Sequence, residues 1–222
     1  MRRSARALVS APPAVGRPKA SLLGVATALL VILAVPSSSG AAVLAPTPYM
    51  GWNTYYGVGG TFDEQTIISV ANSLISSGLA QTGYRIVWLD FGWAGGARDS
   101  NANLVLSSQQ WPDGLPWLTS WLHQHGLQAG IYTDAGSSGC NGQGVGSCGH
   151  YQQDANTFAA WGFDAVKVDF CGAGQEGLDP RVQYPQFAAA LSNNSSGRRR
   201  SRRAGAPTPI SALREAFCSR TC

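Results

Sequence analysis

Residues 49–191 alternate between short apolar runs and longer segments whose apolar residues recur at helical spacing. The short runs are too hydrophobic for a sheet with one face in water, and strands that alternate with helices form a parallel sheet covered by helices. The pattern predicts an α/β fold of four strand-then-helix units. We expect strands at 49–55, 84–90, 127–132 and 163–170, and helices at 62–77, 115–125, 151–161 and 182–191.

Two architectures fit this alternation, an open doubly wound sheet and the first half of an eight-stranded barrel. The glycine-rich phosphate fingerprint of a dinucleotide fold is missing after the first strand, since the glycines of 57–60 are a lone cluster. Polar residues stand at the ends of successive strands: Asp90, then Tyr132 with Asp134, then Asp169. Barrel enzymes build their active sites at that rim, so we predict a (β/α)8 TIM-barrel type, truncated after about four βα units.

The first 42 residues have the layout of a secretory signal peptide. Five basic residues and no acidic one precede the apolar run 22–35, and small residues fill 37–42. The alternative, a membrane-spanning helix, needs about 20 apolar residues, which is more than this run supplies. We therefore expect cleavage near Ala41 or Ala42, secretion, and no stable membrane association afterwards.

The C-terminal segment 198–222 carries seven arginines and one acidic residue. Residues 21–197 contain four basic residues against eleven carboxylates, a net charge of 4 − 11 = −7. An acidic body argues against a nucleic-acid partner, because such partners are bound through positive charge. The expected organisation is a signal peptide at 1–42, a half-barrel at 43–197, and a tail at 198–222 that is unstructured or read from a shifted frame.

The fourth expected strand contains the most informative pair of residues. Side chains alternate along a strand, so Lys167 and Asp169 share one face while Val166 and Val168 share the other. The valines suit the helix layer, which directs Lys167 and Asp169 to the barrel interior. A structural ion pair is the alternative, but a cation beside Asp169 would keep it ionised, as a nucleophile requires.

Aromatic residues accompany these carboxylates at the strand ends: Trp52, Trp88, Trp93 and Tyr132. A single tryptophan is more often plain core, but a group of them at one rim is typical of a sugar pocket. Glycosidases combine such pockets with two carboxyl groups, one of which is often a nucleophile.

Four ordered motifs resemble those of the α-galactosidase (melibiase) family, glycoside hydrolase family 27 of clan D. They read PYMGWNTYY, WLDFGW, GLQAGIYTDAGSSGC and WGFDAVKVDFC. The resemblance implies a (β/α)8 barrel followed by an antiparallel β domain, a carbohydrate substrate, and double displacement with retention at a terminal α-galactoside, with no metal or organic cofactor.

By the same resemblance, the expected site residues are the nucleophile Asp169 and the substrate-binding residues Trp52, Asp90, Tyr132 and Lys167. The resemblance also pairs Cys140 with Cys171 in a disulfide and leaves Cys148 free or as the alternative partner of Cys140.

The sequence departs from the family pattern in two places. Phe91 stands where the family has the second of two adjacent aspartates, and the family's acid/base aspartate lies beyond the fourth unit. The leading hypothesis is thus a retaining α-galactosidase-type hydrolase that is inactive as truncated. A related specificity, such as β-L-arabinopyranoside or α-glucan hydrolysis, and a non-catalytic sugar-binding remnant are the alternatives.

Overall fold

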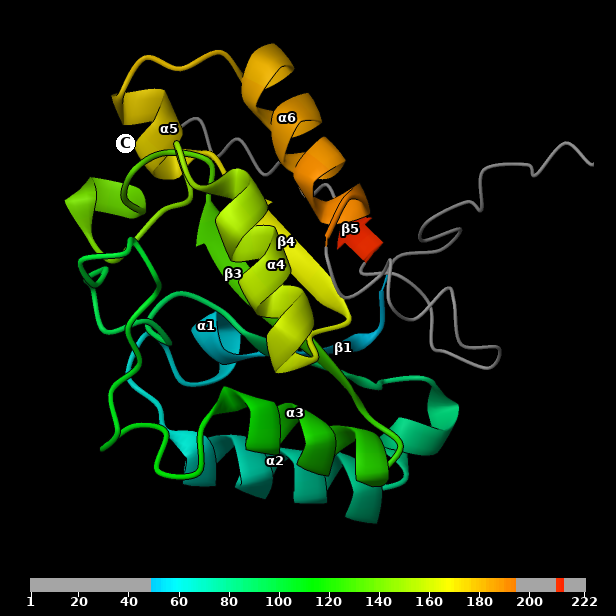
Figure 1. Cartoon of the computed structure of the whole chain (residues 1–222). Coiled ribbons are helices and arrows are strands. Elements are labelled where there is room, and N and C mark those ends of the chain that lie inside the picture. The colour runs from blue at the N-terminus through cyan, green and yellow to red at the C-terminus, as the bar shows by residue number, and fades with distance from the viewer. Residues whose placement is uncertain (1–48, 195–210, 214–222) are drawn as a thin grey trace, which may run out of the picture. The chain divides into compact units, whose positions relative to one another are not determined.

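The computed structural model describes residues 49–194 and 211–213, so the expected signal peptide and most of the expected tail lie outside the described residues (Figure 1). The strands form one parallel sheet in the order β1-β2-β3-β4-β5. Their bounds are β1 Gly51–Asn53, β2 Ile86–Leu89, β3 Gln128–Asp134, β4 Ala165–Asp169 and β5 Ser211–Leu213. The prediction that the first four strands lie adjacent and parallel in chain order is confirmed.

Helices connect the strands at the expected places. The α-helices are α1 Thr54–Gly57, α2 Glu64–Ser76, α3 Leu115–Gln124, α4 Tyr151–Trp161, α5 Cys171–Gln175 and α6 Pro180–Ser192, with short 3-10 turns η1 Leu79–Thr82 and η2 Cys140–Gly142. Asp63 caps the start of α2 by accepting the Thr66 N–H. Gly162, with φ of 89°, ends α4 in the left-handed conformation that glycine adopts readily.

The prediction for the first strand was wrong at its C-terminal end. The expected strand runs to residue 55, but β1 ends at Asn53 and α1 follows at once. The Asn53 side chain accepts the Tyr55 N–H and so caps a helical turn. A strand of three residues places Asn53 and Thr54 at the rim of the sheet.

The helices and one face of the sheet share a single core. Val87, Leu89, Ile131, Val166 and Val168 are buried with helix residues that include Ile67, Leu118 and Phe158. In Figure 1, α4 lies over β3 and β4, and α4 and α6 pack against each other. Lys167 and Asp169 alternate with the valines of β4, so their side chains leave from the opposite face, as predicted.

The last described strand comes from the segment expected to be an unstructured or frame-shifted tail. Ser211–Leu213 runs parallel to β4, with Ser211 in register with Ala165 and Leu213 with Lys167. The expectation for the rest of residues 198–222 stays a prediction. Among the described residues, no helix has the length and apolar character needed to span a membrane.

Candidate active site

The carboxylates at the strand ends lie at one rim of the sheet. Asp90 follows β2 directly, while Asp134 and Asp169 end β3 and β4 in mutual register. Tyr132 is in register with Lys167, one pleat further inside. Because all these strands are parallel, Asp90 and Asp169 share the C-terminal rim, which confirms that prediction.

Asp90 is the centre of a buried polar cluster. It is 2% exposed, and its Oδ2 accepts from Lys167 Nζ at 2.8 Å and from Asn53 Nδ2 at 2.6 Å. Its backbone N–H donates to Thr54 Oγ1, and its Oδ1 accepts the Phe91 N–H. A buried charge needs such partners, and this set fixes Asp90 in one orientation.

Asn53 and Thr54 were not among the predicted site residues. The available signal was their place as polar residues directly after a short apolar run, the same signal that selected Asp90. Their contacts with Asp90 join residues 36 and 37 positions apart in the chain.

Lys167 remains a cation in this cluster. Burial lowers the pKa of its ammonium group, but the negative charges of Asp90 and Asp169 outweigh that effect, and the net shift is upward. Nζ also lies 5.6 Å from the centre of the Tyr132 ring, within the range of a cation–π contact. Burial and the charges of Asp169, Asp134 and Asp90 raise the pKa of the Tyr132 hydroxyl, so it stays a proton donor.

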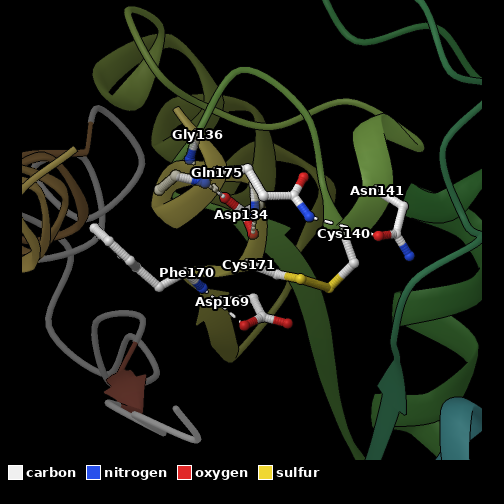
Figure 2. Close-up of a disulfide and its surroundings, with 10 residues drawn as sticks. Asp134, Gly136, Cys140, Asn141, Asp169, Phe170, Cys171 and Gln175 are labelled. Atoms are coloured by element: carbon white, nitrogen blue, oxygen red, sulfur yellow. Dashed lines mark hydrogen bonds between the residues drawn. A yellow bond between two sulfur atoms is a disulfide. The ribbon is translucent and has the colours of Figure 1, made fainter. Parts of the chain in front are cut away.

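Asp169 is the rim carboxylate that a ligand can reach. It is half-buried, whereas Asp90 and Asp134 are 2% and 0% exposed. Its Oδ1 accepts the Phe170 N–H at 2.7 Å, which orients the carboxylate (Figure 2). The Lys167 charge interacts with it, and that favours its ionised form.

Asp134 holds the backbone rather than facing a ligand. Its Oδ1 accepts from the N–H groups of Gly136 and Ala173, and its Oδ2 accepts from that of Gly172. Burial raises the pKa of this carboxyl, and the three N–H donors oppose part of that shift. Asp134 therefore fastens the loop after β3 to the start of α5.

A disulfide reinforces the same junction (Figure 2). Cys140 and Cys171 are bonded with their Cα atoms 4.8 Å apart, which confirms the predicted pairing, and Cys148 is free. Since Cys171 follows Asp169 by two residues, the bond fixes the loop 135–148 beside the candidate nucleophile.

The tryptophans are divided between core and rim. Trp88 and Trp93 are almost fully buried; Trp88 packs against Gly130, and Trp93 donates its indole N–H to the Tyr132 carbonyl. Both serve as core, the alternative noted for a single tryptophan. Trp52 is partly buried, packs over Gly57, and is in register with Val87, while its neighbour Asn53 reaches Asp90.

A cavity of about 290 Å³ opens beside the cluster. Tyr132 and Phe91 form part of its wall, and glycines of the neighbouring loops form much of the rest. Within residues 49–194, no three His, Cys, Asp or Glu side chains group in a way that could hold a metal ion.

Comparison with known proteins assigns the chain to a family. A family model described as Alpha galactosidase A matches residues 58–207, about two thirds of the chain. The chain belongs to this family, glycoside hydrolase family 27. An α-galactosidase of Coffea arabica is 42% identical over 151 residues, which are 68% of this chain and 39% of the coffee protein.

Solved structures of the family share the architecture. The α-galactosidase I of Mortierella vinacea superposes with a TM-score of 0.63 at 38% identity, covering 67% of this chain and 38% of that one. An α-galactosidase of Saccharomyces cerevisiae solved with raffinose has a TM-score of 0.65 at 28% identity, covering 76% of this chain and 35% of that one. The four α/β units thus correspond to part of a TIM-barrel enzyme, and the chain spans about two fifths of the length of these relatives.

Proposed function

We propose that this chain carries the nucleophile half of a retaining glycoside hydrolase that acts on terminal α-galactosides, with Asp169 as the nucleophile. The observation that carries the proposal is the rim arrangement: a reachable Asp169 beside a buried Asp90–Lys167 ion pair, within a barrel of this family. The partner is a carbohydrate substrate. The signal-like first 42 residues support secretion.

In this mechanism, Asp169 attacks the anomeric carbon and displaces the leaving oxygen, forming a covalent glycosyl ester. Water then cleaves the ester from the same face that the leaving group occupied, so the configuration is retained. Lys167 stays protonated and favours the carboxylate form of Asp169. Lys167, Tyr132, Asp90 and Trp52 are the residues proposed to hold the sugar.

A retaining mechanism also needs a second carboxyl group as acid and base. The other carboxylates near Asp169 have structural partners: Asp90 binds Lys167, Asp134 accepts three backbone N–H groups, and Glu176 binds the Ser137 N–H and hydroxyl. We place the acid/base in the part of the relatives' length that residues 43–197 do not span. The chain alone should therefore turn over unactivated glycosides poorly.

The test uses 4-nitrophenyl α-galactoside and the 222-residue chain with its signal segment removed. Missing proton transfer costs about 10²–10⁴-fold, so release of nitrophenol should be slow. Azide attacks a glycosyl ester without a general base, so adding azide should speed release and produce a galactosyl azide. Asp169→Asn should abolish both the slow release and the azide effect, while the matched exposed change Asp179→Asn should alter neither.

Fast release without azide would show that the acid/base lies within residues 43–197. An unchanged rate in Asp169→Asn would remove the nucleophile assignment.

Phe91 supports a second candidate, a related glycosidase specificity such as β-L-arabinopyranoside or α-glucan. A site that loses a carboxylate loses a hydrogen-bond acceptor for sugar hydroxyls, and such acceptors discriminate strongly between substrates. Nitrophenyl β-L-arabinopyranoside and nitrophenyl α-glucoside, measured beside the galactoside, decide between these specificities. Binding of sugar with no turnover under any condition would favour a non-catalytic remnant.

A further inference from the structure

The 290 Å³ cavity lies on one side of the candidate site. Its walls come from Gly60 after β1, residues 91–96 after β2, and Tyr132 with residues 143–145 on and after β3; no residue of β4 or beyond lines it. Asp169 is on β4, so the strand order puts the cavity on the Asp90 side of the rim, away from the nucleophile. Tyr132 is the shared wall, because its ring also lies against Lys167.

The lining of the cavity selects a neutral ligand. No Asp, Glu, Lys, Arg or His side chain is among the lining residues, so neither an anionic nor a cationic group finds a charged partner there. Glycine backbone supplies hydrogen-bonding groups, and Phe91 supplies an aromatic surface. A volume at the lower end of the usual range for small-molecule sites, about 300–1,000 Å³, suits one small ring.

Phe91 is held as a wall by its surroundings. Its ring meets the Tyr132 ring edge-on, with centroids 6.2 Å apart. A β-carbon added at Gly60 would come within 3.2 Å of the ring, and one at Gly144 within 3.3 Å, so glycines at both positions leave the ring its place. The C–H face of a pyranose packs against aromatic surface in the same way as other apolar groups.

We propose that this cavity is a subsite for a second, neutral pyranose ring that the substrate carries on its glycone. This inference rests on the proposed function: with the anomeric carbon at Asp169, the far end of the sugar points to Asp90 and the cavity beyond it. The exocyclic hydroxymethyl group reaches furthest from the anomeric carbon, so a ring attached at O6 would enter the cavity. The chain would then accept α-galactosides whose galactose is not terminal.

Every residue that lines the cavity lies within residues 60–145, so binding is measurable on the 222-residue chain whether or not it is catalytic. The probes are methyl α-galactoside, the same glycoside carrying α-glucose at O6, and melibiose, which extends galactose from C1 instead. Dissociation constants are measured by quenching of tryptophan fluorescence in the Asp169→Asn background. Circular dichroism confirms that each variant is folded.

The O6-extended glycoside should bind about tenfold more tightly than methyl α-galactoside. Phe91→Ala and Phe91→Asp should each lower that advantage several-fold, while Trp117→Ala, at an aromatic residue 40% exposed on α3, should leave it unchanged.

Binding of methyl α-galactoside with no gain from the O6 ring would overturn the subsite and leave the proposed function standing. A Phe91-dependent gain for melibiose would overturn it as well, because the cavity would then hold the leaving group. Failure of all three sugars to bind would reject both proposals.

Discussion

Replacing Arg98 by methionine tests the ion pair that joins the two long rim loops. Its guanidinium contacts both carboxylate oxygens of Asp154 on α4, at 2.8 and 2.6 Å, and donates to the carbonyls of Gly146 and Ala102. The Arg98 side chain is 14% exposed and that of Asp154 is 1% exposed, so the change leaves a buried carboxylate without its cation.

Removing one partner of a buried pair costs about 3–5 kcal/mol, a large share of the roughly 5–15 kcal/mol that stabilise a domain. With an m-value of about 2 kcal/mol per molar urea, the unfolding midpoint should fall by about 2 M. Urea unfolding followed by tryptophan fluorescence measures the shift, because Trp93 and Trp111 are buried next to these loops.

The matched control is Arg181→Met, at an arginine whose side chain is 89% exposed and pairs with Asp179 at the surface; it should not move the midpoint. The double change Arg98→Met with Asp154→Leu should recover most of the loss, because no unpaired charge remains. An Arg98→Met midpoint equal to that of Arg181→Met would refute the reasoning.

Two further predictions concern the disulfide and a buried acid. Cys140→Ser should lower the free energy of unfolding by about 3–4 kcal/mol, from the entropy of a loop closed over 31 positions, whereas Cys148→Ser should leave it unchanged under the same non-reducing conditions. Glu64 is buried at the start of α2, and burial, followed by the charge of Asp113, raises the pKa of its carboxyl. A raised folded-state pKa contributes stability below the unfolded pKa of about 4.3 that is lost as pH rises through the folded value, so Glu64→Gln should flatten this part of the curve of unfolding free energy against pH, and an unaltered curve would contradict the assignment.

Local signals in the sequence sufficed for most of the fold. The helix α4 begins and ends where the apolar spacing and Gly162 predict, and the capping residue Asp63 marks the start of α2. Apolar runs bounded by turn residues located four strands, because a parallel sheet buried on its helix-covered face needs such runs. The first strand was overextended, since aromatic residues 55 and 56 look strand-like although the Asn53 cap starts a helical turn there.

The candidate site was predictable as positions but not as contacts. Asp90, Lys167 and Asp169 stand out as polar residues in apolar strands. The structural use of Asp134 depends on N–H groups of Gly172 and Ala173, which lie 38 and 39 residues further along the chain. No local pattern distinguishes this backbone-holding carboxylate from the ligand-facing Asp169.

Covalent trapping of the nucleophile tests the central claim most directly. The probe is 2-deoxy-2-fluoro-α-galactosyl fluoride: its fluoride leaves without protonation, so the label does not depend on an acid/base residue beyond residues 43–197. Digestion and mass spectrometry locate the label. The account predicts one fluorogalactosyl group on Asp169 and none in the Asp169→Asn variant; a label on Asp90 or Asp134, or an unlabelled Asp169 in chain that binds galactoside, would contradict it.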